Sequence, residues 1–186
     1  MNAPASLPAL VVVDRDGVIN RESPDFIRSA AEWQPLPGSL EAIARLHRAG
    51  VPVAIATNQS GLGRGLFDAA TLAAIHRKMV TAIESAGGAL VGIFVCPHAP
   101  AAGCACRKPL PGLMHQIEAA AGCKLAGQPV IGDSERDLRA AQAVGARAIL
   151  VRTGNGRDTE ARLAGTERLE VFDDLSAAVT ALIGSA

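Results

Sequence analysis

Leu10–Gly17 has the sequence LVVVDRDG, an apolar run that ends directly in a pair of carboxylates. Its β-branched residues predict a strand that is buried on both faces, as in a parallel sheet. Asp14 and Asp16 follow at the carboxyl end of this strand, immediately before a glycine turn. Because neighbouring carboxylates repel each other, such a pair requires a cation or strong hydrogen bonds nearby. The stretch therefore predicts a site for metal-assisted chemistry at the edge of a parallel sheet.

Strand-like and helix-like segments alternate along the rest of the chain. We expect further strands over residues 51–56, 90–95, 129–131, 148–151 and near 169–172. We expect helices over residues 39–49, 68–86, 112–121, 135–144 and from about 174, with Ser39 as the N-cap of the first helix. A glycine-rich loop is expected after residue 151. This alternation predicts a doubly wound, Rossmann-like parallel sheet with helices on both faces. The irregular stretches over 20–37 and 96–111 are each too short to build a covering domain with its own core. We therefore expect a single α/β domain over residues 1–186, with no separate cap domain.

The composition bears on the partners of the chain. Its 186 residues carry 18 basic and 18 acidic side chains, so the net charge is zero, which argues against a nucleic-acid groove or an anionic membrane surface. Aromatic residues make up only 3%, which leaves little surface for stacking on bases. No apolar stretch reaches the roughly 20 residues of a bilayer span, and the first apolar run lacks the basic segment that precedes it in a signal peptide. We therefore expect a cytoplasmic monomer that acts on a small molecule, with no nucleic-acid or membrane partner.

Polar side chains follow several of the predicted strands. Asp14, Thr57 and Asp133 each stand at or just beyond a carboxyl end. In parallel α/β sheets the ligand site lies beyond these ends, so we expect the three side chains to meet. Each has a simpler interpretation when taken singly, because Asp and Thr are common turn and cap residues. By the same reasoning, Lys108 alone is a solvated cation and Asp137 alone an exposed helix charge.

The same residues form short motifs that together resemble the haloacid-dehalogenase-like phosphatases. The four motifs are Asp14-x-Asp16-Gly17, Thr57 after a strand, Lys108-Pro109 before a helix, and Gly132-Asp133 with Asp137. They occur in the order that the family has, and the later strands fit the same fold. The resemblance implies a haloacid-dehalogenase-like fold and an enzyme that hydrolyses phosphate monoesters.

The resemblance also assigns each motif a role in phosphoryl transfer, which needs an in-line nucleophile and dispersal of charge on the phosphoryl oxygens. Asp14 would be the nucleophile that forms an aspartyl-phosphate, and Asp16 would be the general acid and base. Asp14, Asp133 and the backbone carbonyl of Asp16 would hold Mg²⁺, which prefers oxygen ligands. The remaining roles are stabilisation of the phosphoryl group by Thr57 and Lys108, and support of the metal or orientation of Lys108 by Asp137.

A second cluster of reactive side chains occupies the loop 96–111. Its candidate ligands are Cys96, His98, Cys104 and Cys106. Three thiolates and one imidazole suit a closed tetrahedral zinc site with no open position for catalysis. Ordinary buried thiols or a redox pair are the alternatives. We expect structural zinc, which would order this irregular loop and place Arg107 and Lys108 over the phosphate.

The zinc loop narrows the resemblance to the heptose-bisphosphate and histidinol-phosphate phosphatases. DRDGVIN at 14–20, TNQSG at 57–61 and CACRKP at 104–109 resemble the heptose enzymes. This implies removal of the C7 phosphate of D-glycero-D-manno-heptose 1,7-bisphosphate, a step toward lipopolysaccharide and other surface polysaccharides. Arg107 would recognise the substrate, because a guanidinium binds a second phosphate bidentately. The further substrate-binding candidates are Glu22, Ser23, Pro24, Asp25, Thr57, Asn58, Gln59, Ser60, Arg64, Lys108 and Ser134.

Alternative functions remain open at this point. Histidinol phosphate is the other substrate that the zinc loop allows. An alternative from another class is a zinc-stabilised interaction module with a vestigial phosphatase site, which the intact acidic and basic motif residues disfavour. The segment Gly154-Asn155-Gly156 has the glycines of a phosphate cradle but lacks the P-loop pattern, so we expect a plain turn there.

Overall fold

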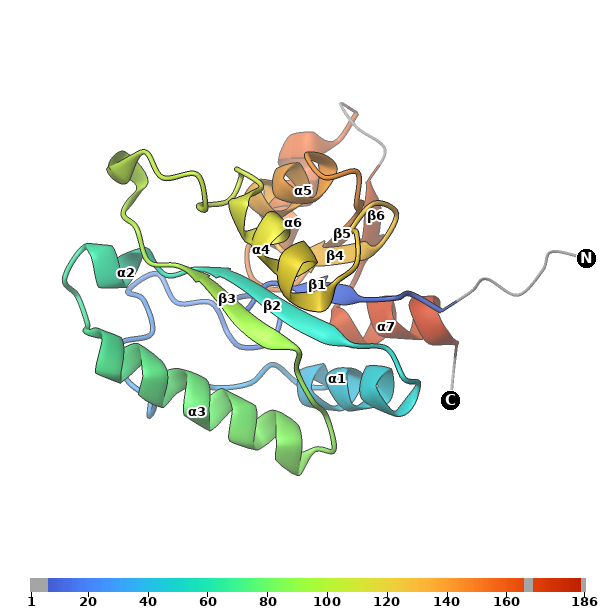
Figure 1. The fold of residues 1–186 in the computed structure, drawn as a ribbon, viewed down its shortest axis with the longest axis horizontal. Helices are drawn as coiled ribbons and strands as arrows, with labels where there is room; N and C mark the ends of the chain where they lie inside the picture. The colour runs from blue at the N-terminus through green and yellow to red at the C-terminus, as the bar shows by residue number, and fades with distance from the viewer. Residues whose placement is uncertain (1–6, 166–168, 185–186) are drawn as a thin grey trace, which may run out of the picture.

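The computed structural model describes residues 7–165 and 169–184. Within them, a six-stranded sheet has the order β3-β2-β1-β4-β5-β6 (Figure 1). Its strands are β1 (Val11–Val13), β2 (Val53–Asn58), β3 (Gly92–Cys96), β4 (Pro129–Gly132), β5 (Arg147–Val151) and β6 (Glu170–Phe172). Every neighbouring pair is parallel, so all the carboxyl ends lie along the same edge. The chain order reverses beside β1, which makes this edge the expected place for a ligand.

Helices cover both faces of the sheet, as the alternating pattern predicts. They are α1 (Ser39–Arg48), α2 (Ser60–Gly63), α3 (Ala69–Ser85), α4 (Gly112–Ala121), α5 (Glu135–Gln142), α6 (Gly156–Leu163) and α7 (Leu175–Ile183), with a 3₁₀ turn over Pro100–Ala102. In Figure 1, α1, α3 and α7 lie below the sheet, and α4, α5 and α6 lie above it. The doubly wound α/β fold is thereby confirmed. No helix among the described residues is long and apolar enough to cross a membrane.

The central strand β1 explains why its sequence is apolar at every position. Val11 and Val13 belong to the core cluster beneath the sheet, together with side chains of α1, α3 and α7. Val12 belongs to the opposite cluster, which includes side chains of α4 and α5. All three valines are fully buried. A strand sandwiched in this way keeps no polar position until it leaves the sheet, which it does at Asp14.

The structure differs from the sequence-based expectation in several local features. The expected glycine-rich loop after β5 contains α6, because Gly156 begins a helix. A Cβ there would lie 1.7 Å from the carbonyl oxygen of Val151, so this helix starts with a residue that is usually a poor helix former. Ser39 is not the N-cap of α1, since Gly38 takes that position and the Ser39 hydroxyl donates to the carbonyls of Ile19 and Leu36.

Element ends account for most of the remaining differences. β2 begins and ends two residues later than expected, because its pairing with β1 starts at Val53 opposite Val11. The helix expected over 68–86 is α3, for which Asp68 is the N-cap and accepts a hydrogen bond from the Thr71 amide. The short helix α2 was not expected. It turns the chain immediately after β2, and so fixes the segment that follows Thr57 at the carboxyl edge.

Candidate active site

An acidic cluster lies where β1 and β4 end. Oxygen atoms of Asp14, Asp133 and Asp137 all lie within 4.8 Å of one another. Asp14 leaves β1 directly, whereas Asp133 follows β4 and Asp137 lies in the first turn of α5. Burial raises the pKa of Asp14 well above its usual range; Lys108 opposes this rise, and Asp137 and Asp133 add to it. Burial and then repulsion from Asp137 raise the pKa of Asp133 to about 7.

Lys108 is the cation that faces this cluster. Its Nζ donates to Asp14 Oδ1 at 2.9 Å, to Asp137 Oδ1 at 2.6 Å and to the Ala56 carbonyl at 2.7 Å. Burial alone would lower the pKa of Lys108, but the carboxylates of Asp137 and Asp14 outweigh it and raise the pKa. The Asn58 side chain bonds both the backbone N–H and the carbonyl of Lys108. The end of β2 therefore holds the lysine loop in place.

Asp137 contacts this lysine, and orientation of Lys108 was one of the two roles considered for it. Its Oδ1 contacts Lys108, and its Oδ2 accepts hydrogen bonds from the backbone and hydroxyl of Ser134 at 3.0 and 2.6 Å. The bond from the Ser134 backbone is one half of the capping box of α5, and in the other half the Asp137 backbone N–H donates to the Ser134 side chain. Gly132 leaves room for the contact, since a Cβ there would lie 2.1 Å from the Asp137 Cβ. Both carboxylate oxygens are thus engaged within the protein.

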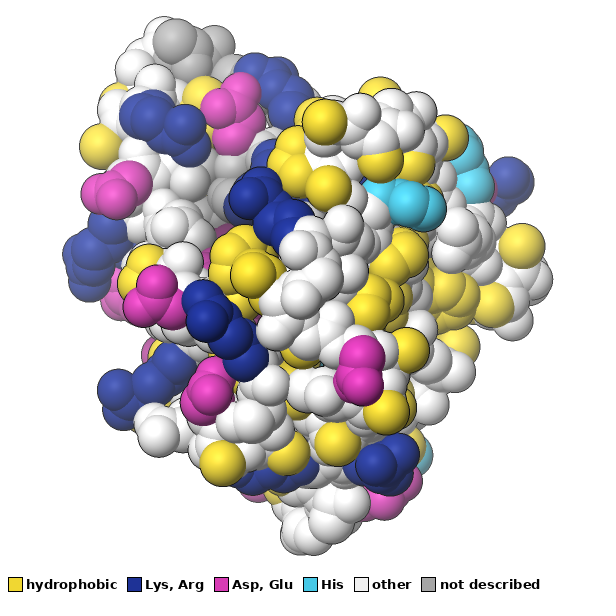
Figure 2. All heavy atoms as spheres, turned by 90° about the vertical axis from the view of Figure 1, so that its left-hand side faces the viewer, with side chains coloured by type: hydrophobic (Ala, Val, Ile, Leu, Met, Phe, Trp, Pro, Cys, Tyr) yellow, Lys and Arg dark blue, Asp and Glu magenta, His cyan; other side chains and the backbone are white. Residues whose placement is uncertain are grey.

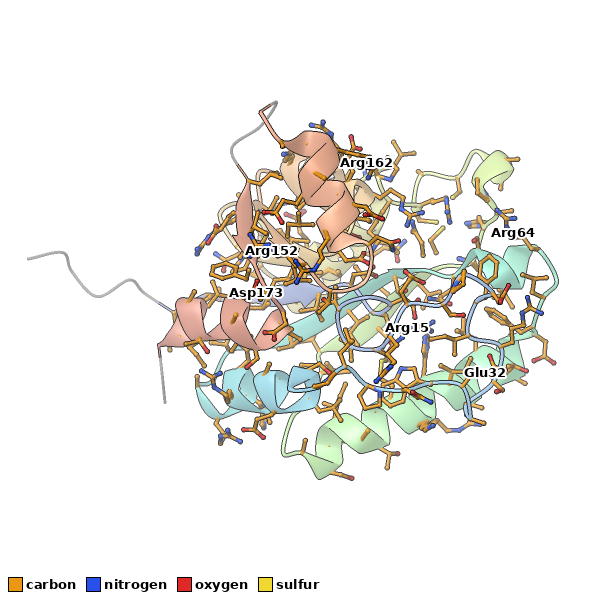
Figure 3. The ribbon with its side chains drawn as sticks, turned by 180° about the vertical axis from the view of Figure 1, so that it is seen from behind. Arg15, Glu32, Arg64, Arg152, Arg162 and Asp173 are labelled. Atoms are coloured by element: carbon orange, nitrogen blue, oxygen red, sulfur yellow. The ribbon has the colours of Figure 1, made fainter. Side chains whose placement is uncertain are left out.

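The carboxylate of Asp16 is held apart from the acidic cluster. Arg15 binds it through Nε and Nη2 at 2.8–3.0 Å, and Asn20 and Gln59 donate to it at 2.9 and 2.8 Å. Arg15 is itself buried, and its Nη1 lies 3.2 Å from His76 Nε2 on α3. Figure 3 shows Arg15 between the sheet and α3. Five donor contacts from three residues therefore fix the orientation of this carboxylate.

The remaining oxygen donors suit a hard divalent cation. Asp14 and Asp133 are two of the three ligands expected for Mg²⁺, and their separation allows them to share one ion. Lys108 supplies one positive charge against the carboxylates of Asp14, Asp133 and Asp137. The cluster therefore keeps an excess of negative charge that a divalent cation would neutralise.

A cleft of about 140 Å³ opens beside this centre. Its lining includes the expected residues Asp14, Asp16, Glu22, Ser23, Pro24, Thr57, Asn58, Gln59, Ser60, Arg107, Lys108 and Ser134. Gln59 is buried, and its Nε2 joins Asp16 to the Thr57 hydroxyl at 2.8 Å each. Two expected substrate-binding residues lie outside the cleft lining: Asp25 borders a neighbouring hollow, and Arg64 lies over the Phe26 ring, 5.8 Å from its centroid. The expected Mg²⁺ ligand Asp133 is not part of that lining either, and lies with Asp14 in the acidic cluster.

Some residues around the cleft were not identified from the sequence. Phe26, Ile27 and Arg136 line it. Phe26 has φ of 64°, a conformation that its sequence does not signal. Arg136 could have been suggested by its place between Asp133 and Asp137 at the start of α5. Asn155, in the segment expected to be a plain turn, contacts Asp133 through its backbone and its side chain.

The thiols and the imidazole of the loop after β3 converge on one point. His98 Nδ1 lies 3.6 Å from Cys96 Sγ and 3.2 Å from Cys106 Sγ, and Cys104 Sγ lies 3.6 Å from both other sulfurs. Ligands of tetrahedral zinc, at about 2.0–2.3 Å from the metal, are separated by about 3.3–3.8 Å. The donor set and its spacing therefore fit zinc.

The cysteine loop also contacts α2, the short helix that begins at the cleft residue Ser60. The Gly63 amide at the end of α2 donates to the Pro97 carbonyl at 2.9 Å, and a Cβ at Gly63 would lie only 2.6 Å from that oxygen. Arg107 Nη1 contacts the His98 carbonyl at 3.4 Å. Figure 2, which faces this edge of the sheet, shows basic side chains beside acidic ones, with neither sign covering the face. A continuous basic groove for a polyanion is therefore absent from this view.

Comparisons with known proteins agree with this arrangement. A family model described as HAD-hydrolase-like matches residues 105–178. The chain is 52% identical over 177 residues to the D-glycero-beta-D-manno-heptose-1,7-bisphosphate 7-phosphatase of Bordetella bronchiseptica, covering 95% of this chain and 99% of that protein. It is 47% identical over 175 residues to the protein of the same name from Pseudomonas aeruginosa, covering 94% and 98%. The crystal structure of D,D-heptose 1,7-bisphosphate phosphatase from B. bronchiseptica, complexed with magnesium and phosphate, matches with a TM-score of 0.91 at 52% identity, over 95% of this chain and 99% of that one.

Proposed function

Because this chain belongs to the D-glycero-β-D-manno-heptose-1,7-bisphosphate 7-phosphatase family of haloacid-dehalogenase-like hydrolases, and is a phosphatase, we propose that it removes the C7 phosphate of that β-anomeric bisphosphate. The product is heptose 1-phosphate. The observation that carries the proposal is the buried contact of Lys108 with both Asp14 and Asp137 at the strand ends. This contact joins the first, third and fourth motifs in one place, which a vestigial site has no reason to preserve.

Asp14 is the nucleophile in this proposal. Its Oδ1 accepts hydrogen bonds from the Arg15 amide at 2.8 Å and from Lys108 at 2.9 Å, which leaves Oδ2 to attack phosphorus. The attack forms an aspartyl-phosphate and expels the C7 oxygen of the sugar, and water then hydrolyses the acyl phosphate. Mg²⁺, held by Asp14, Asp133 and the carbonyl of Asp16, would neutralise carboxylate charge and polarise the phosphoryl group.

Lys108 and Thr57 stabilise the phosphoryl group as charge develops on its oxygens. The lysine is almost fully buried and is oriented by Asp137, so little reorganisation is required when a phosphate arrives. Gln59 donates to the Thr57 hydroxyl, which leaves the hydroxyl hydrogen free to be donated to a phosphoryl oxygen.

Asp16 protonates the departing C7 oxygen and later takes a proton from the attacking water. In the structure its carboxylate is bound by Arg15, Asn20 and Gln59. To reach the leaving group, the carboxyl must give up some of these bonds. We therefore propose that the side chain turns from Arg15 toward the leaving group when substrate fills the cleft.

Arg107 lines the cleft together with Lys108, so it can meet the part of the substrate beyond the transferred phosphoryl group. This arginine lies at the zinc loop, where its long contact to the His98 carbonyl leaves most of its donors available to the distal phosphate at C1. We propose that zinc bound by the four-residue Cys/His cluster fixes that loop, and thereby the position of Arg107.

A kinetic comparison tests this function. The purified protein with Mg²⁺ is assayed on the β-1,7-bisphosphate, on its α anomer and on histidinol phosphate. We expect the highest kcat/KM for the β anomer, by at least about tenfold, and loss of turnover when Mg²⁺ is chelated. A preference for histidinol phosphate would overturn the substrate assignment. Absence of Mg²⁺-dependent turnover on all three would favour the interaction-module alternative.

A further inference from the structure

The turn between β5 and α6 contains an asparagine that does not perform the usual task of its position. Asn155 is the N-cap of α6, where an Asn side chain commonly accepts a hydrogen bond from the first helical turn. Its side chain makes no such bond. Instead, Nδ2 donates to Asp133 Oδ2 and to Glu22 Oε2, at 3.1 Å each. The backbone N–H of Asn155 donates to the same Asp133 oxygen at 2.7 Å.

Glycines permit this close approach to Asp133. A Cβ on Gly17 or on Gly154 would lie 2.1 Å from Asp133 Oδ2. Both glycines have positive φ, 80° and 56°, which other residues rarely adopt. The turns after β1 and β5 therefore both pack against Asp133 Oδ2. Helix capping does not explain the conformation of these turns.

We propose that Asn155 is a positioning residue that fixes Asp133 for a divalent cation and ties it to Glu22. The two Asn155 donors occupy Asp133 Oδ2, so Oδ1 is the oxygen left to bind the ion. Outer donors of this kind orient metal ligands and raise metal affinity. The inference rests on the proposed function to the extent that Asp133 is a ligand of Mg²⁺.

The bond to Glu22 adds a second consequence. Glu22 lines the cleft next to Ser23 and Pro24, in the segment before Phe26. Without a donor between them, the carboxylates of Glu22 and Asp133 would repel each other. The Asn155 side-chain amide bridges the two carboxylates. A shift in the position of Asp133 therefore reaches the cleft-lining Glu22 through this one side chain. Residue 155 thereby couples cation affinity to substrate affinity.

Calorimetric titration with Mg²⁺ alone tests the first part. The full-length Asn155→Ala protein, with its zinc retained, keeps the backbone donor and loses only the side-chain donor. We expect its Kd for Mg²⁺ to rise about tenfold over that of the unsubstituted protein. Arg157→Ala, an exposed change on the same helix, is the matched control and should leave the Kd unchanged. A Kd for Asn155→Ala within twofold of the unsubstituted protein overturns the proposal.

A double-mutant cycle tests the coupling. At saturating Mg²⁺, Asn155→Ala should raise KM for the bisphosphate several-fold with kcat within twofold, and this rise should vanish in a Glu22→Ala background. Additive effects of the two changes would overturn the coupling. If the unsubstituted protein itself binds no Mg²⁺, the proposed function fails together with this inference. If the unsubstituted protein binds Mg²⁺ and Asn155→Ala binds it equally well, only the inference fails.

Discussion

The carboxylate of Asp16 is held by donors from three other residues. Arg15, Asn20 and Gln59 all donate to it, so the side chain must give up some of these bonds to reach a leaving group in the cleft. The sequence identified this residue through its motif, but it gave no sign of the buried arginine that holds the side chain.

Asp16→Asn tests the acid role through the leaving group. We expect kcat/KM for the heptose bisphosphate to fall by about 10²–10⁴-fold, because an amide cannot protonate the sugar oxygen. An aryl phosphate such as p-nitrophenyl phosphate has a leaving group that needs no proton, so its kcat should fall by less than about tenfold. Equal losses on the two substrates would contradict the assignment.

Arg107→Met tests recognition of the distal phosphate. A charge-assisted hydrogen bond contributes about 1.5–3 kcal/mol, so kcat/KM for the 1,7-bisphosphate should fall at least about tenfold. For heptose 7-phosphate, which lacks the C1 phosphate, the change should be less than twofold. Arg64→Met provides the comparison, because Arg64 lies over the Phe26 ring, outside the cleft lining. An equal loss on the mono- and bisphosphate would contradict this role of Arg107.

His76 gives a prediction for pH and stability. Burial, then repulsion from Arg15, lowers its pKa from 6.5 to about 4. The unfolded chain therefore binds a proton between pH 6.5 and 4 that the folded protein does not, so folding stability falls as the pH falls through this range. In His76→Gln the fall in folding stability at acid pH should be smaller than in the unsubstituted protein by about 1–2 kcal/mol. This figure allows for solvent screening of the partly exposed side chain. Urea unfolding at pH 7 and pH 4.5 measures it, with the exposed His47→Gln as the control. Identical acid-side losses in the two variants would contradict this account.

At the scale of single elements, the loop after β3 depends on its cysteines. The apolar side chains of this loop are small Ala and Pro residues, apart from the exposed Leu110, and the loop contacts α2 through the bond between Gly63 and Pro97. Cys106→Ser should release zinc, lower the Tm by several degrees and raise KM for the bisphosphate, because Arg107 follows directly in the chain. Mg²⁺ affinity should be retained, since the acidic cluster lies on other elements. Unchanged zinc content, Tm and KM would contradict this role of the loop.

Element type was easier to predict than element ends. α3 and α4 have regular apolar stripes and were predicted to within a residue at each end. α6 was missed because Gly154 and Gly156 indicate a turn, and only the close packing of Gly156 against Val151 explains a helix there. Ser39 was wrong as an N-cap because its hydroxyl bonds the carbonyl of the nearby Leu36 and that of Ile19, which is distant in sequence.

For the whole molecule, the parallel sheet explains why the site could be anticipated. Parallel strands bring their carboxyl ends to one edge, so Asp14 lies in one cluster with Asp133 and lines one cleft with Thr57, although the three are far apart in the chain. The sheet does not determine which loops fold over that edge. The bond between Glu22 and Asn155 joins residues 133 positions apart, and nothing in the local sequence of either residue indicates it. The convergence of the motifs at this edge was therefore predictable, whereas the contacts around them required the tertiary structure.

The most direct test of the account is the position at which the bisphosphate loses phosphate. ³¹P NMR of D-glycero-β-D-manno-heptose 1,7-bisphosphate with the protein and Mg²⁺ follows both phosphorus atoms during turnover. We predict that the C7 phosphomonoester signal is replaced by inorganic phosphate while the anomeric C1 signal persists, and that Asp14→Asn leaves both unchanged. Loss of the C1 signal, or turnover by Asp14→Asn, would contradict the account.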